Sequence, residues 1–176
     1  MHAPAVYVKR KGEDWMNRRI IDTPAGRLEL TEAGGRLCAI RAAGTEDDSC
    51  VETDDPVLEE AARQLAQYFA GERREFDLPL HMEGSAFDRA VWRQLLDIPF
   101  GEISTYGKIA AALGKPKASR AVGGACSRNP LLIVVPCHRV IAGTGKLTGF
   151  AAGLAMKRSL LALEGWHIQS DLIKDE

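Results

Sequence analysis

Cysteine is scarce in this sequence, and its few copies lie far apart. The 176 residues include four cysteines, Cys38, Cys50, Cys126 and Cys137, and no CxxC pair. A disulfide framework or a cysteine-rich zinc site needs cysteines at closer or paired spacing. His2 and His81 add no zinc-ligand spacing to Cys38 and Cys50. We therefore expect reduced thiols and no bound metal.

Long apolar runs and nucleotide-binding loops are also missing. No stretch approaches the ~20 apolar residues of a membrane span, and residues 1–19 carry scattered charges where a signal peptide would have an apolar centre. No glycine cluster has the spacing of a dinucleotide-binding fingerprint or a P-loop. We expect a cytoplasmic protein with no membrane partner and no cofactor.

Charge is nearly balanced over the whole chain but segregated along it. The formal net charge is −1. Residues 1–84 carry 11 Lys or Arg against 17 Asp or Glu, whereas residues 85–165 carry 11 against 4. A basic segment gains free energy by displacing counterions from phosphate, so it favours a polyanion partner. A solvated surface with uneven charge is the other interpretation of this pattern.

The first part of the chain predicts a small α/β domain over residues 1–80. Residues 18–43 alternate short apolar runs with the turn sequences TPAG (23–26) and EAGG (32–35), which predicts a three-stranded meander. The acidic segment 44–55 predicts a loop. Asp55 and Pro56 then suit the start of a helix whose apolar residues recur at helical spacing until Gly71.

The second part predicts a mostly helical domain over residues 85–170. Ser85 and Asp88 form a capping pattern that opens a helix ending before Pro99. Thr105 can cap a second helix, and a short turn leads from it into a third helix over residues 117–126. Clustered lysine and arginine near this turn favour a DNA-binding helix-turn-helix, with a plain helical hairpin as the alternative.

Two adjacent glycines stand inside the predicted third helix. Gly123 and Gly124 each cost about 1 kcal/mol relative to alanine in a helix interior. Small residues allow close approach, so the helix either packs tightly on the core or presses into a DNA groove with Arg120 projecting. Composition leaves both alternatives open. A final helix is predicted over residues 153–165.

The strongest chemical signal is the sequence PCHRV at residues 136–140. The apolar run 131–135 predicts a buried strand that ends at Pro136, with a turn at Cys137. A thiol becomes nucleophilic when a base is close, and His138 follows directly. Glu164 is the carboxylate best placed to orient that base, which predicts a relay Glu164, His138, water, Cys137. A buried structural cysteine is the alternative for Cys137 alone.

In context, PCHRV resembles the active-site signature of O6-alkylguanine-DNA alkyltransferases. The resemblance extends over most of the chain. Its further segments are DTPAG (22–26), STYG (104–107), SRAVGGA (119–125), RNP (128–130), GF (149–150) and LEG (163–165). It implies an α+β protein with a ribonuclease H-like N-terminal domain, formed by an antiparallel sheet and a helix, and a C-terminal domain with a winged helix-turn-helix.

The resemblance implies direct-reversal DNA repair. The protein would bind double-stranded DNA, flip an O6-alkylated guanine out through minor-groove contacts, and move the alkyl group irreversibly to Cys137 in a single turnover. O4-alkylthymine would be a poorer substrate. His138 would relay the thiol proton through water, Glu164 would hold the imidazole tautomer, and Tyr106 would protonate or hydrogen-bond the departing guanine.

The resemblance also implies which residues contact DNA and the damaged base. Arg120 would replace the flipped base in the stack, and Asn129 would brace the turn before the active-site strand. The remaining implied DNA contacts are Thr105, Ser119, Ala121, Gly123 and Gly124. Backbone groups at Cys137, Val140 and Ala151 would read the purine edge, with Phe150 lining the pocket. Phe150 stands where tyrosine is frequent, which removes a hydroxyl.

Three other functions stay open. A non-catalytic sensor of alkylated DNA would bind the flipped base without chemistry, although such proteins replace the nucleophile. A transcription regulator would use the helix-turn-helix alone, and a cysteine hydrolase would turn over repeatedly without DNA. We expect a monomer with no obligate protein partner, and leave cooperative loading on DNA open.

Overall fold

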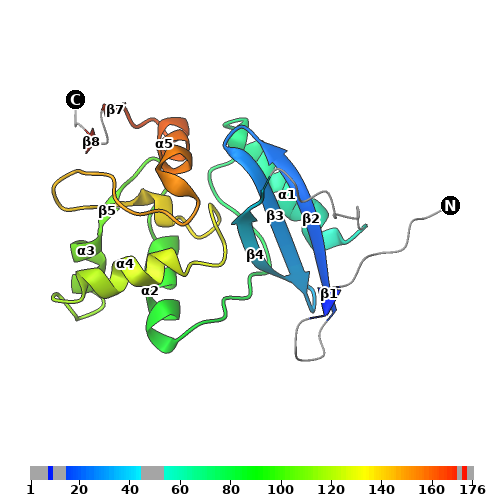
Figure 1. Cartoon of the computed structure of the whole chain (residues 1–176), viewed down its shortest axis with the longest axis horizontal. Coiled ribbons are helices and arrows are strands. Elements are labelled where there is room, and N and C mark those ends of the chain that lie inside the picture. Colours follow the sequence, from blue (N-terminus) through cyan, green and yellow to red (C-terminus); the bar gives the residue numbers. More distant parts are fainter. Residues whose placement is uncertain (1–7, 10–14, 45–53, 170–171, 174–176) are drawn as a thin grey trace. The chain divides into compact units, whose positions relative to one another are not determined.

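The computed structural model describes residues 8–9, 15–44, 54–169 and 172–173, and its contacts divide the chain into two compact units with the boundary between Met82 and Glu83 (Figure 1). The predicted domain limits were 1–80 and 85–170. Among the described residues, no helix has the length and apolar character needed to cross a membrane.

The N-terminal unit is built on an antiparallel sheet. Its strands are β1 (Val8–Lys9), β2 (Trp15–Thr23), β3 (Gly26–Ala33) and β4 (Arg36–Ala42), in the order β1-β2-β3-β4. The predicted three-stranded meander corresponds to β2, β3 and β4, joined by tight turns at Gly26 and at Gly34 and Gly35, all with positive φ. The short strand β1 was not predicted.

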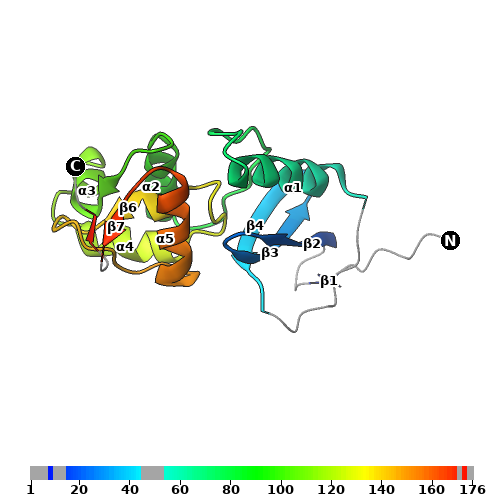
Figure 2. The same ribbon diagram turned by 90° about the horizontal axis from the view of Figure 1, so that it is seen from above.

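Helix α1 (Pro56–Phe69) covers one face of this sheet (Figure 2). Asp55 caps it by accepting hydrogen bonds from the Val57 and Leu58 amides, as the sequence predicted. Fully buried leucine and isoleucine side chains on the sheet, together with Leu58, Leu65 and Tyr68 on the helix, form the core. Most of the predicted acidic loop lies outside the described residues.

The C-terminal unit is mainly helical. Its helices are α2 (Ala86–Leu96), α3 (Tyr106–Ala112), α4 (Ser119–Ser127) and α5 (Gly153–Leu163), and its short strands are β5 (Ser104–Thr105), β6 (Val140–Ile141), β7 (Ile168–Gln169) and β8 (Leu172–Ile173). Strands β5 and β6 pair in parallel, and β7 pairs with β8. Ser85 and Thr105 cap α2 and α3.

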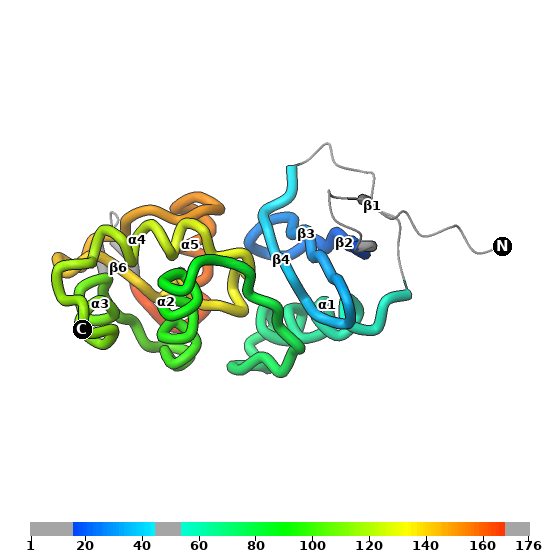
Figure 3. The backbone as a smooth tube through the Cα atoms, turned by 90° about the horizontal axis from the view of Figure 1, so that it is seen from below, coloured from blue at the N-terminus to red at the C-terminus, as the bar shows by residue number. Residues whose placement is uncertain are grey.

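Helices α2, α3 and α4 pack against one another, and a short turn joins α3 to α4, the pair for which a helix-turn-helix was predicted (Figure 3). Helix α4 starts at Ser119 instead of the predicted residue 117, because residues 115–118 close the turn through a hydrogen bond from the Ala118 amide to the Lys115 carbonyl, 2.8 Å. The indole of Trp92 donates to the Ala125 carbonyl at 2.9 Å and fixes α4 on α2.

The predicted strand over residues 131–135 is wrong. These residues are buried, as expected, but they form a turn in which Ile133 has φ 72°. The side chain of Asn129 hydrogen-bonds the Leu131 amide and the Val135 carbonyl, so two backbone groups that a strand partner would satisfy are satisfied locally. Cys137–Arg139 then form a short 3-10 helix, η1, which leads into β6.

Candidate active site

The thiol of Cys137 lies at the start of η1 and is 3% exposed. A hydrogen bond from the Cys137 amide to the Val135 carbonyl, 2.8 Å, tightens the backbone just before it. The Asn129 side-chain nitrogen lies 3.1 Å from the Cys137 sulfur and donates to it. One side chain therefore holds both the loop and the thiol that follows it.

His138 and Glu164, which the sequence placed in one relay, are in contact. His138 Nε2 lies 3.0 Å from Glu164 Oε1, and neither side chain is exposed. An ionised carboxylate can only accept, so Nε2 carries the proton and Nδ1 is left as an acceptor. His138 Nδ1 is buried and has no hydrogen-bond partner within the described part of the chain.

Arg139 is a site residue that the sequence analysis missed. Its guanidinium donates to Glu164 through Nε, at 2.9 Å from Oε2, and through Nη2, at 2.9 Å from Oε1. Nη1 donates to the Ile98 carbonyl at 2.6 Å. Burial favours a higher pKa for Glu164, but hydrogen bonds from His138 and Arg139 outweigh burial and lower that pKa to about 2. The carboxylate is therefore ionised at neutral pH.

Lys157 on α5 is a second missed residue, and it is fully buried. Its ammonium donates to the carbonyls of Val140, at 2.6 Å, and Thr148, at 3.0 Å. Burial lowers the pKa of Lys157 to about 8, although the nearby thiols of Cys137 and Cys126 oppose the shift. Lys157 lies one helical turn before the buried Leu160 and Leu161, on the buried side of α5.

The thiol and the imidazole are both neutral in the resting site. Burial raises the pKa of Cys137, although the hydrogen bond from Asn129 and the charge of Lys157 oppose the change. Burial lowers the pKa of His138, against the influence of Glu164. A neutral imidazole is able to accept a proton, and a neutral thiol is a weak nucleophile until it loses one. The site therefore holds a neutral thiol and a neutral base at neighbouring positions in the chain.

Tyr106, at the start of α3, is half-buried, and its hydroxyl donates to the Thr148 carbonyl at 3.2 Å. The Lys157 ammonium donates to the same carbonyl, so the Thr148 carbonyl connects Tyr106 with Lys157. Burial raises the pKa of Tyr106, so the hydroxyl keeps its proton at neutral pH. A methyl group added at Gly123 would lie 3.8 Å from the Tyr106 ring, which places this glycine of α4 against the site.

Cys126 is the other thiol near this region. It is buried on α4, and burial raises its pKa to about 12. It therefore stays protonated at neutral pH and is a poor nucleophile compared with a thiol that has a base beside it.

The predicted DNA-contact residues cluster on the helix-turn-helix. Arg120 and Ala121 are exposed on α4, whereas Val122, Ala125 and Cys126 on the same helix face the core. Lys108, Lys115 and Lys117 are also exposed on α3 and the turn, and Ser119, Gly123 and Gly124 lie partly buried along α4. Thr105 serves as the cap of α3. The exposed part of the motif is therefore basic.

The predicted base-reading residues come from two segments. Val140 is buried on β6, and its carbonyl accepts from Lys157, which leaves one lone pair for another donor. Phe150 is half-buried and Ala151 is exposed in the loop before α5. The Phe150 carbonyl accepts from the Gly153 amide at 3.0 Å, which shapes that loop.

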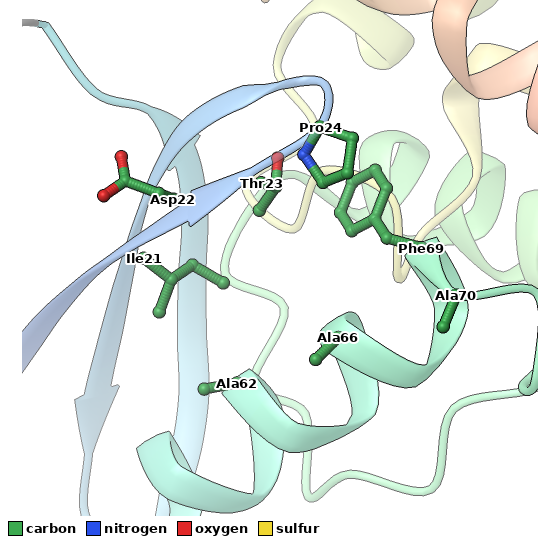
Figure 4. A pocket seen from close by; sticks show the side chains of 8 residues that line it. All are labelled: Ile21, Asp22, Thr23, Pro24, Ala62, Ala66, Phe69 and Ala70. Atoms are coloured by element: carbon green, nitrogen blue, oxygen red, sulfur yellow. The ribbon is translucent and has the colours of Figure 1, made fainter.

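A pocket of about 470 Å³ lies in the N-terminal unit, between the β2–β3 turn and α1 (Figure 4). Its lining is Ile21, Asp22, Thr23, Pro24, Ala62, Ala66, Phe69 and Ala70, so it holds no thiol or imidazole. Within the ranges the structure describes, no group of three or more His, Cys, Asp or Glu residues is placed to hold a metal. His2 and Cys50 lie outside those ranges.

Two family models match the chain, one for each unit. Residues 86–166 match the DNA binding domain of 6-O-methylguanine DNA methyltransferase, and residues 16–82 match its ribonuclease-like domain. The first match contains PCHRV, Tyr106, Lys157 and Glu164. The second contains the meander and α1.

Curated relatives and solved structures agree with these matches. A methylated-DNA--protein-cysteine methyltransferase of Mycolicibacterium paratuberculosis is 46% identical over 88% of this chain and 95% of its own. One of Methanosarcina acetivorans is 57% identical over 67% of this chain and 75% of its own. The O6-methylguanine methyltransferase of Mycobacterium tuberculosis has a TM-score of 0.75 at 44% identity, covering 85% of this chain and 92% of its own. A crystal structure of Mycobacterium tuberculosis OGT in complex with DNA has a TM-score of 0.76 at 46% identity, covering 84% and 91%.

Proposed function

The chain belongs to the 6-O-methylguanine DNA methyltransferase family, and on that premise we propose how its residues carry out repair. Its activity is that of a methylated-DNA--protein-cysteine methyltransferase, which repairs DNA by moving an alkyl group to a cysteine of the protein. The acceptor in this chain is Cys137. The observation that supports this most directly is the buried thiol of Cys137, followed in the chain by His138, whose imidazole an ionised carboxylate orients.

The proposed reaction is a displacement at the alkyl carbon. The Cys137 thiol gives its proton through a bridging water to His138 Nδ1, and the sulfur forms a bond to the carbon as the bond from carbon to guanine O6 breaks. Tyr106 hydrogen-bonds the departing guanine or protonates it. When it gives its proton, Tyr106 is left as a phenolate and His138 as an imidazolium, and transfer of one proton from the imidazolium to the phenolate through water returns both to their neutral forms. Glu164 holds His138 in the tautomer that leaves Nδ1 free.

The product is a thioether, and a carbon–sulfur bond of this kind is not readily hydrolysed. Each molecule therefore acts once, and its inactivation is part of the proposed mechanism. A thiolate attacking carbon needs neither a metal nor a nucleotide, so no cofactor enters the proposal. The protein works as a monomer, in the cytoplasm, on double-stranded DNA with no obligate protein partner.

The helix-turn-helix supplies the proposed DNA contact. Helix α4 enters the minor groove, Arg120 takes the place of the flipped base, and Ser119, Ala121, Gly123 and Gly124 allow close approach. Thr105, which caps α3, contacts the DNA backbone. The exposed lysines around the turn support this placement, because they add positive charge facing a phosphate backbone. We propose that this helix-turn-helix is of the winged type.

When the flipped base is bound near Cys137, backbone groups of Cys137, Val140 and Ala151 read the purine edge, and the Phe150 ring lies against the base. Asn129 braces the turn that carries the thiol, which its contacts with Leu131, Val135 and Cys137 support. O6-alkylguanine is the main substrate, and O4-alkylthymine is transferred less well.

Intact-protein mass spectrometry tests the proposal. Wild type, Cys137→Ala and the control Cys38→Ala are each mixed with duplex DNA that contains one O6-methylguanine. We expect one methyl group on wild type and on Cys38→Ala, mapped to the peptide of Cys137, and none on Cys137→Ala. Tight DNA binding by wild type without any adduct would contradict alkyl transfer and favour the damage-sensor alternative.

A further inference from the structure

The carboxylate of Glu164 has more partners than the orientation of His138 requires. Besides the contact with His138 Nε2, it accepts three charged hydrogen bonds from Arg139, two of them from Nε, and one from the Gly101 amide at 3.3 Å. We propose that Arg139 is a positioning residue that keeps His138 neutral, with Nδ1 free to accept the proton of Cys137. This inference rests on the proposed function, because it concerns the base of that reaction.

The geometry fixes the carboxylate in one orientation. Oε1 is shared by His138 Nε2 and Arg139 Nη2, while Oε2 accepts from Arg139 Nε and the Gly101 amide. The guanidinium is itself held, since Nη1 donates to the Ile98 carbonyl. Its planar, two-pronged contact matches a carboxylate as a lysine ammonium cannot. Glu164 therefore cannot rotate away from His138 Nε2 without breaking several hydrogen bonds.

The charges explain why this second partner matters for the base. Three ionised groups influence His138: Glu164 after α5, Arg139 on η1 and Lys157 on α5, and the neutral thiol of Cys137 precedes it. The positive charge of Arg139 offsets the negative charge of Glu164. Without it, a buried carboxylate would face the imidazole alone and would favour the imidazolium. An imidazolium carries a proton on Nδ1 and cannot accept another from the thiol.

A purely structural clamp would behave differently. If Arg139 only held the segments together, its loss would lower stability and slow the reaction equally at every pH. If it also keeps His138 neutral, its loss raises the pKa of His138 and moves the acidic limb of the reaction to higher pH. The protonation state of one imidazole therefore separates the two roles.

Nitrogen-15 NMR of the histidine rings measures this state directly in the free protein. The variants are Arg139→Met, which removes the charge, Arg139→Lys, which keeps the charge but loses the two-pronged contact, and Arg63→Lys as a control. Arg63 makes a two-pronged contact with Glu60 on the exposed side of α1. His138→Gln identifies the signal among the four histidines, and circular dichroism checks folding.

In wild type and Arg63→Lys we expect a neutral His138 with its proton on Nε2 at neutral pH, and a titration midpoint below that of an ordinary histidine. In Arg139→Met we expect the titration midpoint to rise by about one pH unit or more, and in Arg139→Lys by less. The rate of methyl transfer by each variant should fall as the pH is lowered, with the same midpoint as the titration of His138. If Arg139→Met does not fold, the inference is tested by Arg139→Lys alone, in which the titration midpoint of His138 should still rise.

An unchanged midpoint in the folded arginine variants, or a proton on Nδ1 in wild type, would overturn the inference. The NMR readout needs no DNA. Failure of methyl transfer by wild type would therefore count against the proposed function, whereas an unshifted titration in a transferring protein would count against the role of Arg139 only.

Discussion

The two units differ in how many charged side chains they bury together. In the N-terminal unit, ion pairs lie near the surface: Arg63 and Glu60 are 54% and 38% exposed, and Asp22, paired with Arg27, is 85% exposed. In the C-terminal unit, Arg139, Lys157, His138 and Glu164 are all buried. Isolated burial of an ionised group costs several kcal/mol, so each buried charge there needs its own set of partners.

This difference shows where the fold accepts a cost in stability for chemistry. The N-terminal unit has an apolar core, and its ion pairs keep some contact with water; its one buried charged side chain in the described residues, Glu32, accepts hydrogen bonds from Asn17 and the Gly35 amide. The C-terminal unit buries its charges around one thiol, where low polarity strengthens their mutual interactions. Matched substitutions in the two units can separate the loss of stability from the loss of reactivity.

The largest expected effect comes from two buried amide side chains. Asn129 bridges the Leu131 amide and the Val135 carbonyl, and Gln64 makes the same kind of bridge to the amide and carbonyl of Asp77. Replacing Asn129 by alanine leaves the buried Leu131 amide without its partner, so this variant should lower the free energy of unfolding by about 2 kcal/mol. Asp77 is exposed, so water can replace the Gln64 side chain there, and Gln64→Ala should lower the free energy of unfolding by less. Only Asn129→Ala should slow methyl transfer, by ~100-fold, because the thiol loses its support.

Urea unfolding and single-turnover kinetics, both at low temperature where each variant is folded, measure the two effects. Equal loss of transfer in Gln64→Ala would show that the two units do not differ in this way. A normal rate of methyl transfer by Asn129→Ala would show that Asn129 does not support the reaction of Cys137.

A smaller effect concerns pH and two carboxylates. Glu164 and Glu60 both have a pKa lowered to about 2, Glu164 despite burial and Glu60 by hydrogen bonds from Arg63 and Gln64. A lowered folded pKa stabilises the protein above the unfolded value near 4.5, and this stability is lost as pH falls towards about 2. Glu164→Gln should therefore be less stable than wild type at pH 7, by a gap that narrows by roughly 2 kcal/mol at pH 3.

Glu60→Gln should show almost no such gap, since water and salt screen an exposed pair. Urea midpoints between pH 3 and pH 7 measure both variants. A constant gap for Glu164→Gln across that range would mean that its carboxylate is not ionised in the folded site.

The smallest expected effect compares two glycines with positive φ. Gly71 (φ 77°) ends α1 in open space, and Gly101 (φ 80°) donates its amide to Glu164. Alanine at either position should cost about 1 kcal/mol in a left-handed conformation. Gly101→Ala should also slow transfer a few-fold, which thermal unfolding and transfer rates would show together. Slowed transfer in Gly71→Ala would contradict the division between the units.

Local sequence signals predicted most of the fold. Turn sequences gave the meander, and Asp55, Ser85 and Thr105 marked the starts of three helices, because a cap is decided within four residues. The strand predicted over residues 131–135 was wrong, because five apolar residues fit a buried strand and a buried turn equally well. The deciding group is the Asn129 amide, whose bonds to positions up to eight residues away leave no periodic pattern.

The site was only partly predictable for a related reason. Cys137 and His138 adjoin one another in a specific motif, and Glu164 was found by elimination. Arg139 and Lys157 were missed because a charged residue in a sequence normally indicates solvent. Their burial depends on Ile98, Val140 and Thr148, whose carbonyls meet them only after folding.

The burial of Cys137 also determines how long an idle molecule remains usable. Under the proposed single-turnover reaction, the protein must keep its sulfur unoxidised until it meets a damaged base. A protonated thiol that is 3% exposed reacts slowly with peroxide and other small oxidants in the surrounding fluid. The same feature that makes the resting nucleophile weak therefore preserves the cell's stock of unused repair molecules.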